Sequence, residues 1–315
     1  MQLSITIFAI NNNTQTMLRK ILYFLVLLPF MIACKSGGQG KDAGLSIPDS
    51  VLNEGLEMSA DVMQDIVQNI SSPVEMAALI KDLGVDYSNQ YISTTDRVDN
   101  LSTSFQQALN LGIYGADLGY LNMYNRTSAV IDYISAIKTL ADAIRVGQFF
   151  DFTTLKRLAT NSNNLDSLMY ISVHSFNEMD KYLHSNNRTN LSALIVTGVW
   201  IEGLYLGTQV YKTAPDEMLA ERIGEQKLTI DQLMLILNQF TSERQYADLV
   251  DQLLTISALY NDVTISIEMG EPEMIEENGM LTIVQNEKSI VNITPEQLNA
   301  IIDATEQVRN RLISD

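Results

Sequence analysis

The chain has 315 residues, of which 46% are hydrophobic, and a formal net charge of −18. This hydrophobic content is typical of a globular protein with a sizeable core and argues against a disordered chain. The excess of acidic residues argues against nucleic acid as a partner and against binding to anionic lipid headgroups by charge, because both depend on Lys and Arg.

The N-terminus has the features of an export signal. Met17 is followed by Arg19 and Lys20, and then by an apolar run over residues 21–33. A basic start, a short apolar segment and a small residue before the cut are typical of a signal peptide. The run is shorter than the ~20 residues that a membrane-spanning helix needs. We therefore expect residues 1–33 to be a signal peptide with its true start at Met17.

Cys34 directly follows this leader and is the only cysteine in the chain. A lone cysteine in an exported protein has no partner for an intrachain disulfide, so it needs another role. Residues 30–34, with Ala33 before the cysteine, resemble the lipobox of bacterial lipoproteins, although Met31 stands where that motif has Leu. The resemblance implies cleavage before Cys34 and lipid attachment to it, which would anchor the protein to a membrane. The alternative is an incidental cysteine in an ordinary signal peptide.

Residues 34–47 are rich in glycine and polar residues, which predicts a flexible tether. Surface-exported lipoproteins of the Bacteroidota resemble one another in carrying acidic residues just after the cysteine. Lys35 and Ser36 stand there in this chain. This difference favours an outer-membrane lipoprotein that faces the periplasm.

Residues 48–315 are expected to form a helical domain, because apolar residues recur at the helical period along most of them. Expected helices begin near Asp49 and Pro73, the second ending before Gly84, and a polar loop follows over residues 86–95. Further helices are expected over residues 98–124, 127–146, 152–160, 165–184 and 190–211.

Sequences that resemble capping boxes place later helix starts at Thr213, Thr229, Ser242 and Thr294. The short polar breaks between the helices predict antiparallel helical hairpins packed as a bundle. The expected fold class is therefore mainly all-α.

A small β-hairpin is expected near the C-terminus. Residues 263–268 alternate in hydropathy with period two, and an acidic loop is expected over residues 271–278. Residues 280–285 and 289–293 are expected to pair across residues 286–288.

Two of the expected helices share an unusual mix of glycine, aromatic residues and one acid. Asp117 precedes Tyr120 by three residues, and Glu202 precedes Tyr205 by three. The similarity suggests that the domain consists of two related halves. Glycine destabilises a helix, so we expect these glycines to allow close approach of helix backbones. They are Gly112, Gly115, Gly119, Gly198, Gly203 and Gly207.

The acids of these two helices are candidates for a site, because each lies in an apolar stretch. A buried carboxylate must be paired, hydrogen-bonded or protonated. One interpretation is structural, with an arginine or a helix N-terminus as the partner. The other is a pocket for a cationic or hydroxylated ligand. Its candidate residues are Asp117, Tyr120, Trp200, Glu202 and Tyr205, with Tyr114 beside them.

The helix expected over residues 190–211 is long and apolar enough to cross a membrane. Glu202 lies at its middle, however, and no basic flank would orient it. We therefore expect a core helix of the domain.

The sequence has no catalytic motif. His174 and His184 do not form HExxH, and no P-loop, Rossmann glycine run or nucleophile elbow is present. Imelysin-type envelope proteins are also helical and lipid-anchored, but neither histidine lies in their GxHxxE motif. We expect no catalytic residue, no metal site and no cofactor.

As a whole, the chain resembles the uncharacterised all-helical lipoproteins of the Bacteroidota cell envelope. The resemblance rests on the leader, the helical body and the closing helix, with residues 293–298 and 308–313. It implies a location and a fold and no activity. We expect a non-enzymatic binding or scaffold module, held at a membrane by its lipid, whose partner is an unidentified protein or small molecule. The alternative is a ligand- or metal-binding protein of imelysin-like style, with hydrolysis as an option.

Overall fold

The computed structural model describes residues 79–81, 83–159, 165–269, 273–277, 280–284 and 287–314. The expected signal peptide, Cys34, the tether and the helix starts at Asp49 and Pro73 lie outside these residues. The described part is mainly helical, with short antiparallel strand pairs near the C-terminus, so the predicted fold class is confirmed at this level.

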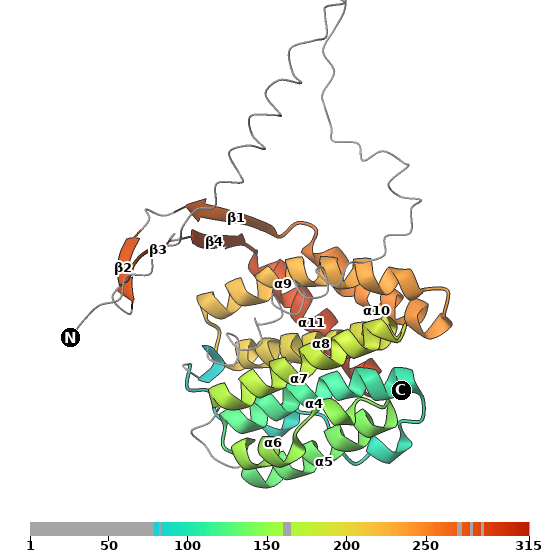
Figure 1. Cartoon of the computed structure of the whole chain (residues 1–315). Coiled ribbons are helices and arrows are strands. Elements are labelled where there is room, and N and C mark those ends of the chain that lie inside the picture. Colours follow the sequence, from blue (N-terminus) through green and yellow to red (C-terminus); the bar gives the residue numbers. More distant parts are fainter. Residues whose placement is uncertain are drawn as a thin grey trace, which may run out of the picture. The chain divides into compact units, whose positions relative to one another are not determined.

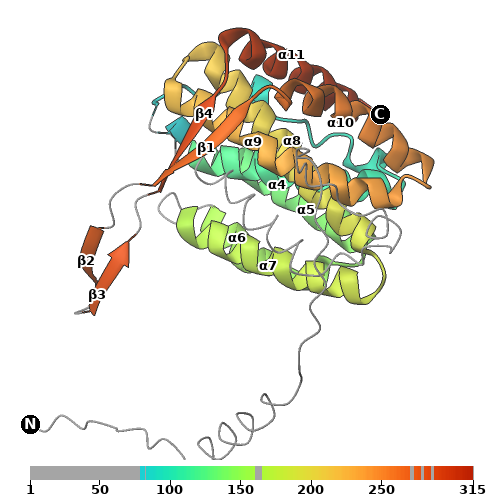
Figure 2. The same cartoon turned by 90° about the horizontal axis from the view of Figure 1, so that it is seen from above.

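The helices cover most of the described chain (Figures 1 and 2). They are α4 (Ser104–Met123), α5 (Thr127–Ala143), α6 (Phe152–Ala159), α7 (Leu165–Ser185), α8 (Thr189–Thr213), α9 (Glu217–Leu237), α10 (Arg244–Tyr260) and α11 (Pro295–Leu312). Short 3-10 helices are η1 (Asn89–Tyr91), η2 (Val98–Asn100), η3 (Gly147–Phe149) and η4 (Asn238–Phe240).

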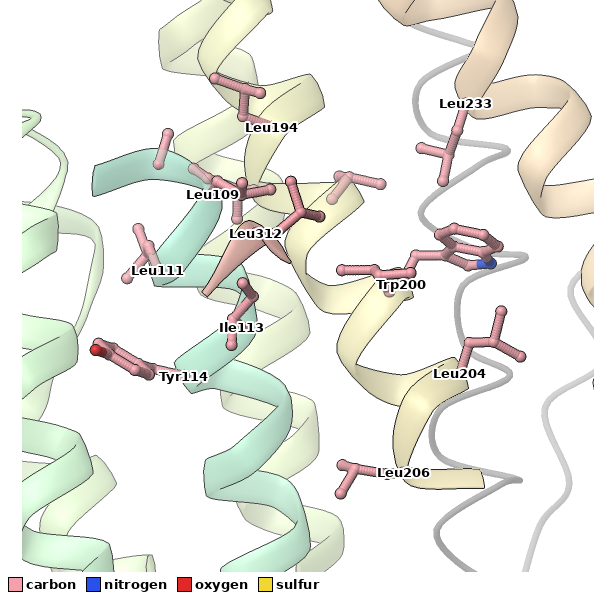
Figure 3. Packing of buried hydrophobic residues seen from close by; sticks show 14 of the residues in the cluster. Leu109, Leu111, Ile113, Tyr114, Leu194, Trp200, Leu204, Leu206, Leu233 and Leu312 are labelled. Atoms are coloured by element: carbon pink, nitrogen blue, oxygen red, sulfur yellow. The ribbon is translucent and has the colours of Figure 1, made fainter. Parts of the chain in front are cut away.

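Helices α4 and α8 lie side by side at the centre of this packing (Figure 3). Helix α5 packs on α4, and α6 and α7 continue from α5 back to α8. Helices α9 and α11 pack on the other side of α8, and α10 contacts both of them (Figure 1). Gly112 of α4 and Gly198 of α8 lie where the two central backbones touch, which confirms the predicted role of these two glycines. Gly115 and Gly119 have no neighbour in reach, so the prediction was wrong for them.

Helix α8 passes the length and hydropathy tests for a membrane span, with a mean hydropathy of 1.4. Yet 89% of that apolar window is buried against the rest of the domain. The prediction of a core helix is therefore confirmed.

Several helices end at a residue in the left-handed region, at the expected breaks near Asn125 and Asn187 and also at Arg145, where the helix expected over residues 127–146 ends early. Asn125, Arg145 and Asn187 have φ values of 54°, 60° and 55°, and each follows the end of a helix. Gly84, the predicted end of the helix that includes residues 79–81, has a φ of 63°. This conformation lets backbone N–H groups return to the last carbonyl groups of the helix.

The predicted helix starts were partly wrong. A capping box between Thr103 and Gln106 begins α4, later than the expected residue 98. The capping box at Thr294 is confirmed for α11. Helix α8 runs to Thr213, and Asp216 caps α9 instead.

Two further starts were also wrong. Thr229 lies buried within α9, because an uninterrupted apolar face continues past it. Helix α10 begins after Glu243, without a side-chain cap, so Ser242 does not cap it. A sequence that resembles a capping box therefore marks a helix start only where the preceding backbone is not itself helical, as at Thr103 and Thr294.

The strands pair differently from the prediction. β1 (Thr264–Met269) pairs with β4 (Glu287–Asn292), and β2 (Glu273–Glu277) pairs with β3 (Met280–Val284). The expected pairing of residues 280–285 with 289–293 is wrong. The sequence between Glu277 and Met280 is Asn-Gly, the dipeptide that most favours a two-residue hairpin turn. The acidic segment expected as a loop therefore supplies β2.

A buried carboxyl cluster as candidate functional site

Asp117 of α4, Glu202 of α8 and Arg309 of α11 form a buried cluster between the three helices. The first two side chains are 0% exposed and Arg309 is 3% exposed. Arg309 donates to both oxygens of Glu202, from Nε to Oε2 at 2.9 Å and from Nη2 to Oε1 at 2.6 Å. This is the bidentate geometry that makes an arginine–carboxylate pair strong and specific.

Asp117 is bound on one oxygen only. Its Oδ2 accepts from the backbone N–H of Ser93 at 3.0 Å, whereas no described donor reaches Oδ1. Burial raises the pKa of Asp117 well above its usual range, and the charge of Glu202 and a hydrogen bond with that carboxyl group raise it further. The Ser93 N–H and the charge of Arg309 act in the opposite direction. A proton on Oδ1, donated to Glu202, would satisfy both carboxyl groups.

The charge of Arg309 is stabilised from several sides. Burial alone would lower its pKa, but the hydrogen bonds and charge of Glu202 outweigh burial, and the pKa is raised. The guanidinium also lies over the ring of Tyr205, 4.2 Å from its centroid, which is a cation–π contact. With one proton shared by the two carboxyl groups, the cluster is electrically neutral.

The cluster binds a segment that is irregular except for η1, and we call it the strap (residues 85–97). Arg309 Nη2 donates to Ser93 Oγ at 2.8 Å and to the carbonyl oxygen of Tyr91 at 3.4 Å. Together with the bond from Ser93 N–H to Asp117, these contacts connect the strap to both ends of the cluster. Ser93 is itself 5% exposed.

Tyrosine hydroxyls bind further main-chain atoms of the strap. Tyr124 donates to the carbonyl of Val85 at 2.7 Å, Tyr114 donates to that of Thr94 at 3.1 Å, and Tyr133 donates to that of Ser93. The hydroxyl of Tyr120 accepts from the N–H of Ser88 at 3.1 Å. Apart from the single 3-10 turn η1, the strap thus has main-chain groups paired by side chains rather than by regular structure, as burial requires.

The spacing along α4 explains this arrangement. Tyr114, Asp117, Tyr120 and Tyr124 follow one another at intervals of three, three and four residues, so they share one face of the helix. That face lies along the strap. The aromatic residues and the one acid on this face of α4 therefore bind the main chain of the strap.

The structure brings together four of the five candidate pocket residues. Asp117 lies close enough to Glu202 for that carboxylate to raise its pKa, Tyr205 contacts Arg309, and Tyr120 binds the strap on the same face of α4 as Asp117. Trp200 is the exception. It lies on the α9 side of α8, where its Nε1 donates to Gln226 at 3.1 Å (Figure 3).

Arg309, Ser93 and Tyr133 were not identified from the sequence. Arg309 could have been, because it follows Thr305 by four residues and Ile302 by seven on the apolar face of α11. A charged residue on an apolar helix face needs a buried partner. No pattern in the sequence identifies Ser93 or Tyr133, because Ser93 reaches the cluster only where the strap packs on it and Tyr133 joins it through the carbonyl of Ser93.

His174 and His184 lie exposed on α7, apart from this cluster. Within the described residues, no group of three or more His, Cys, Asp and Glu side chains is arranged to hold a metal ion. The chemistry open to the cluster is hydrogen bonding and the gain or loss of a proton.

Comparison of the chain with protein-family models found no match. Comparisons with curated proteins and with solved structures also found none.

Proposed function

We propose that this chain is a lipoprotein of the bacterial cell envelope, anchored through lipid on Cys34, whose helical body is a non-enzymatic binding or scaffold module. The observation that carries the proposal is the position of the only cysteine, directly after a basic and apolar leader that ends in Ala33. Nothing in the acidic body would attract it to anionic lipid, so the lipid would supply the attachment. The body would face the periplasm from the outer membrane.

The buried cluster supports a scaffold over an enzyme. Asp117 and Glu202 are the acids most suited to catalysis by their setting, yet both are fully buried and bound to protein groups. A general acid or base must come within hydrogen-bond reach of its substrate. The alternative, an imelysin-like protein that binds a ligand or a metal, needs these acids to become accessible.

The two related halves would each be built on one helical hairpin, α4–α5 in one and α8–α9 in the other. The reciprocal contact of Gly112 and Gly198 supports this proposal, because each glycine meets the same backbone positions of the other helix. If Gly112 is aligned with Gly198, Asp117 aligns with Gly203, one residue after Glu202. The two acids would then have arisen separately within the related halves.

Incorporation of labelled palmitate into the full chain tests the anchor. We expect label and membrane attachment in the parent protein, and loss of both in Cys34→Ala. Ser36→Ala, two residues away, is the matched control and should keep both. Label retained by Cys34→Ala would contradict the proposal, and so would a parent protein that takes up no label.

A further inference from the structure

The strap and the carboxyl cluster share their key contacts. Ser93 donates its N–H to Asp117 and accepts a hydrogen bond on Oγ from Arg309. If the strap left its position, Asp117 of α4 and Arg309 of α11 would lose their hydrogen bonds to Ser93 at the same time. The strap can therefore respond to a change of charge in the cluster.

We propose that Asp117, Glu202 and Arg309 form a proton-dependent latch for the strap. The strap stays docked while the two carboxyl groups hold one proton between them, and it opens locally when that proton leaves.

The charge balance of the cluster supports the latch. With the proton in place, one carboxylate faces one guanidinium, and Asp117 can donate to Glu202. Without it, two adjacent carboxylates share the single charge of Arg309, and Oδ1 of Asp117 has no described donor. Buried like charges repel strongly because the interior screens them poorly. Opening the strap removes Ser93 from the cluster and lets water hydrate the second charge.

Among the residues that the structure describes, no other group facing Asp117 is placed to take this role. The tyrosine hydroxyls around it stay neutral, since burial raises the pKa of Tyr114 to about 12 and also raises that of Tyr133. Among the described residues, the titratable and charged groups that face Asp117 or act on its neighbours are Tyr87, Asp96 and Arg97 of the strap, Tyr114 of α4, Arg126 between α4 and α5, Tyr133 of α5, Glu202 and Tyr205 of α8, and Arg309 of α11.

The strap joins the helix that includes residues 79–81, whose Ile80 is buried in the core, to α4. The latch concerns contacts within the body and does not rest on the proposed lipid anchor.

Hydrogen exchange of the strap amides in the full chain tests the latch. Exchange is followed by mass spectrometry from about pH 4 to about pH 9 and corrected for the intrinsic pH dependence of amides. If opening releases one proton, strap protection should fall by about tenfold per pH unit until the docked pKa is passed. Protection in the centres of α4 and α8 should not follow this slope.

Three variants separate the latch from simple destabilisation. Asp117→Asn imitates the protonated acid, since its amide can donate to Glu202, and it should remove the slope. Tyr133→Phe deletes a strap hydrogen bond without changing charge, so it should lower protection by one factor at every pH. Asp180→Asn is the matched control. Asp180 has a pKa raised by burial, but its partner is Ser192 and it does not touch the strap.

The outcomes are distinct. A slope in the parent and in Asp180→Asn, absent from Asp117→Asn, supports the latch. A parent strap whose corrected protection does not change with pH overturns it, even if Asp117→Asn does not fold. A slope that persists in Asp117→Asn also overturns it, because another group then releases the proton. None of these results bears on lipid attachment at Cys34.

Discussion

Gly112 of α4 and Gly198 of α8 contact one another's helices reciprocally. A Cβ atom on Gly112 would lie 2.0 Å from the carbonyl oxygen of Ile195, and one on Gly198 would lie 2.1 Å from that of Leu109. Each of these carbonyls belongs to the residue three positions before the opposite glycine. The two backbones therefore pack directly, and this contact sets the spacing of the central helix pair that carries Asp117 and Glu202.

Alanine at either contact glycine should destabilise the protein. Gly112→Ala and Gly198→Ala each force a methyl group into a carbonyl oxygen, so α4 and α8 must separate. We expect a loss of about 3 kcal/mol, the upper end of the usual range for overpacked cores. Urea denaturation followed by circular dichroism measures this free energy of unfolding.

Gly115 supplies the matched control on the same helix. A Cβ atom there has no neighbour within 4 Å, and the residue is exposed. Gly115→Ala should therefore stabilise the protein by up to about 1 kcal/mol, through helix propensity alone. Equal effects of Gly112→Ala and Gly115→Ala would contradict direct backbone packing at Gly112.

Removing one partner of the ion pair of Glu202 and Arg309 should cost far more than removing one partner of a second ion pair at the same helix interface. Arg309→Met leaves Glu202 buried without its partner, which typically costs about 3–5 kcal/mol. Lys212 and Glu306 also connect α8 to α11, but their side chains are 38% and 37% exposed. Lys212→Met should cost less than about 1 kcal/mol, the usual limit for an exposed pair.

A double-mutant cycle isolates the buried pair. Glu202→Gln, Arg309→Met and the combined variant are compared by urea denaturation. The double variant should be more stable than the sum of the two single losses predicts, because neither charge then remains unpaired. Additive losses would show that the pair has no coupling and that the cost is one of packing.

The helices of this fold could be predicted because their apolar residues recur locally. The range expected from residue 165 to 184 and the break at Asn125 both came from neighbours in sequence, and the structure confirms them closely. Starts were less certain. Thr229 and Ser242 both begin sequences that resemble capping boxes. Thr229 nevertheless lies inside α9, and α10 begins one residue later than a cap at Ser242 would place it.

The candidate site could be predicted only in part, for a similar reason. Asp117 and Glu202 were found because an acid in an apolar helix demands a partner. The partner itself, Arg309, lies 107 residues beyond Glu202, and only tertiary packing joins them. The strap gave no periodic signal, since its order comes from side chains of α4, α5 and α11.

The confirmed capping box at Thr294 and the rejected one at Ser242 make a direct comparison. Thr294 Oγ1 accepts from the N–H of Gln297 at 3.2 Å, whereas Ser242 caps nothing. Thr294→Ala should cost about 1 kcal/mol, the usual value for loss of a cap, and Ser242→Ala should change the free energy of unfolding by less than about 0.5 kcal/mol. Thermal or urea unfolding of the two variants checks this. A larger loss in Ser242→Ala would contradict the finding that Ser242 does not cap α10.

The raised pKa of Asp117 predicts how stability should change with pH. Its folded pKa lies above the unfolded value of about 3.9, so the folded state holds a proton that the unfolded chain releases. The stabilisation is complete below that value and is lost as the pH rises towards the folded pKa. The free energy of unfolding of the parent should therefore fall relative to that of Asp117→Asn, by at most about 1.4 kcal/mol per pH unit.

Asp151 provides a control of opposite sign. The backbone N–H of Thr154, at the start of α6, is the main cause that lowers the pKa of Asp151. Its stabilisation should therefore appear as the pH rises through about 4 and vanish in acid. Urea denaturation across the pH range should show the parent falling relative to Asp117→Asn while it rises relative to Asp151→Asn. A difference between the parent and Asp117→Asn that is constant with pH would show that folding leaves this acid's proton affinity unchanged, and the buried cluster could then not act through a proton.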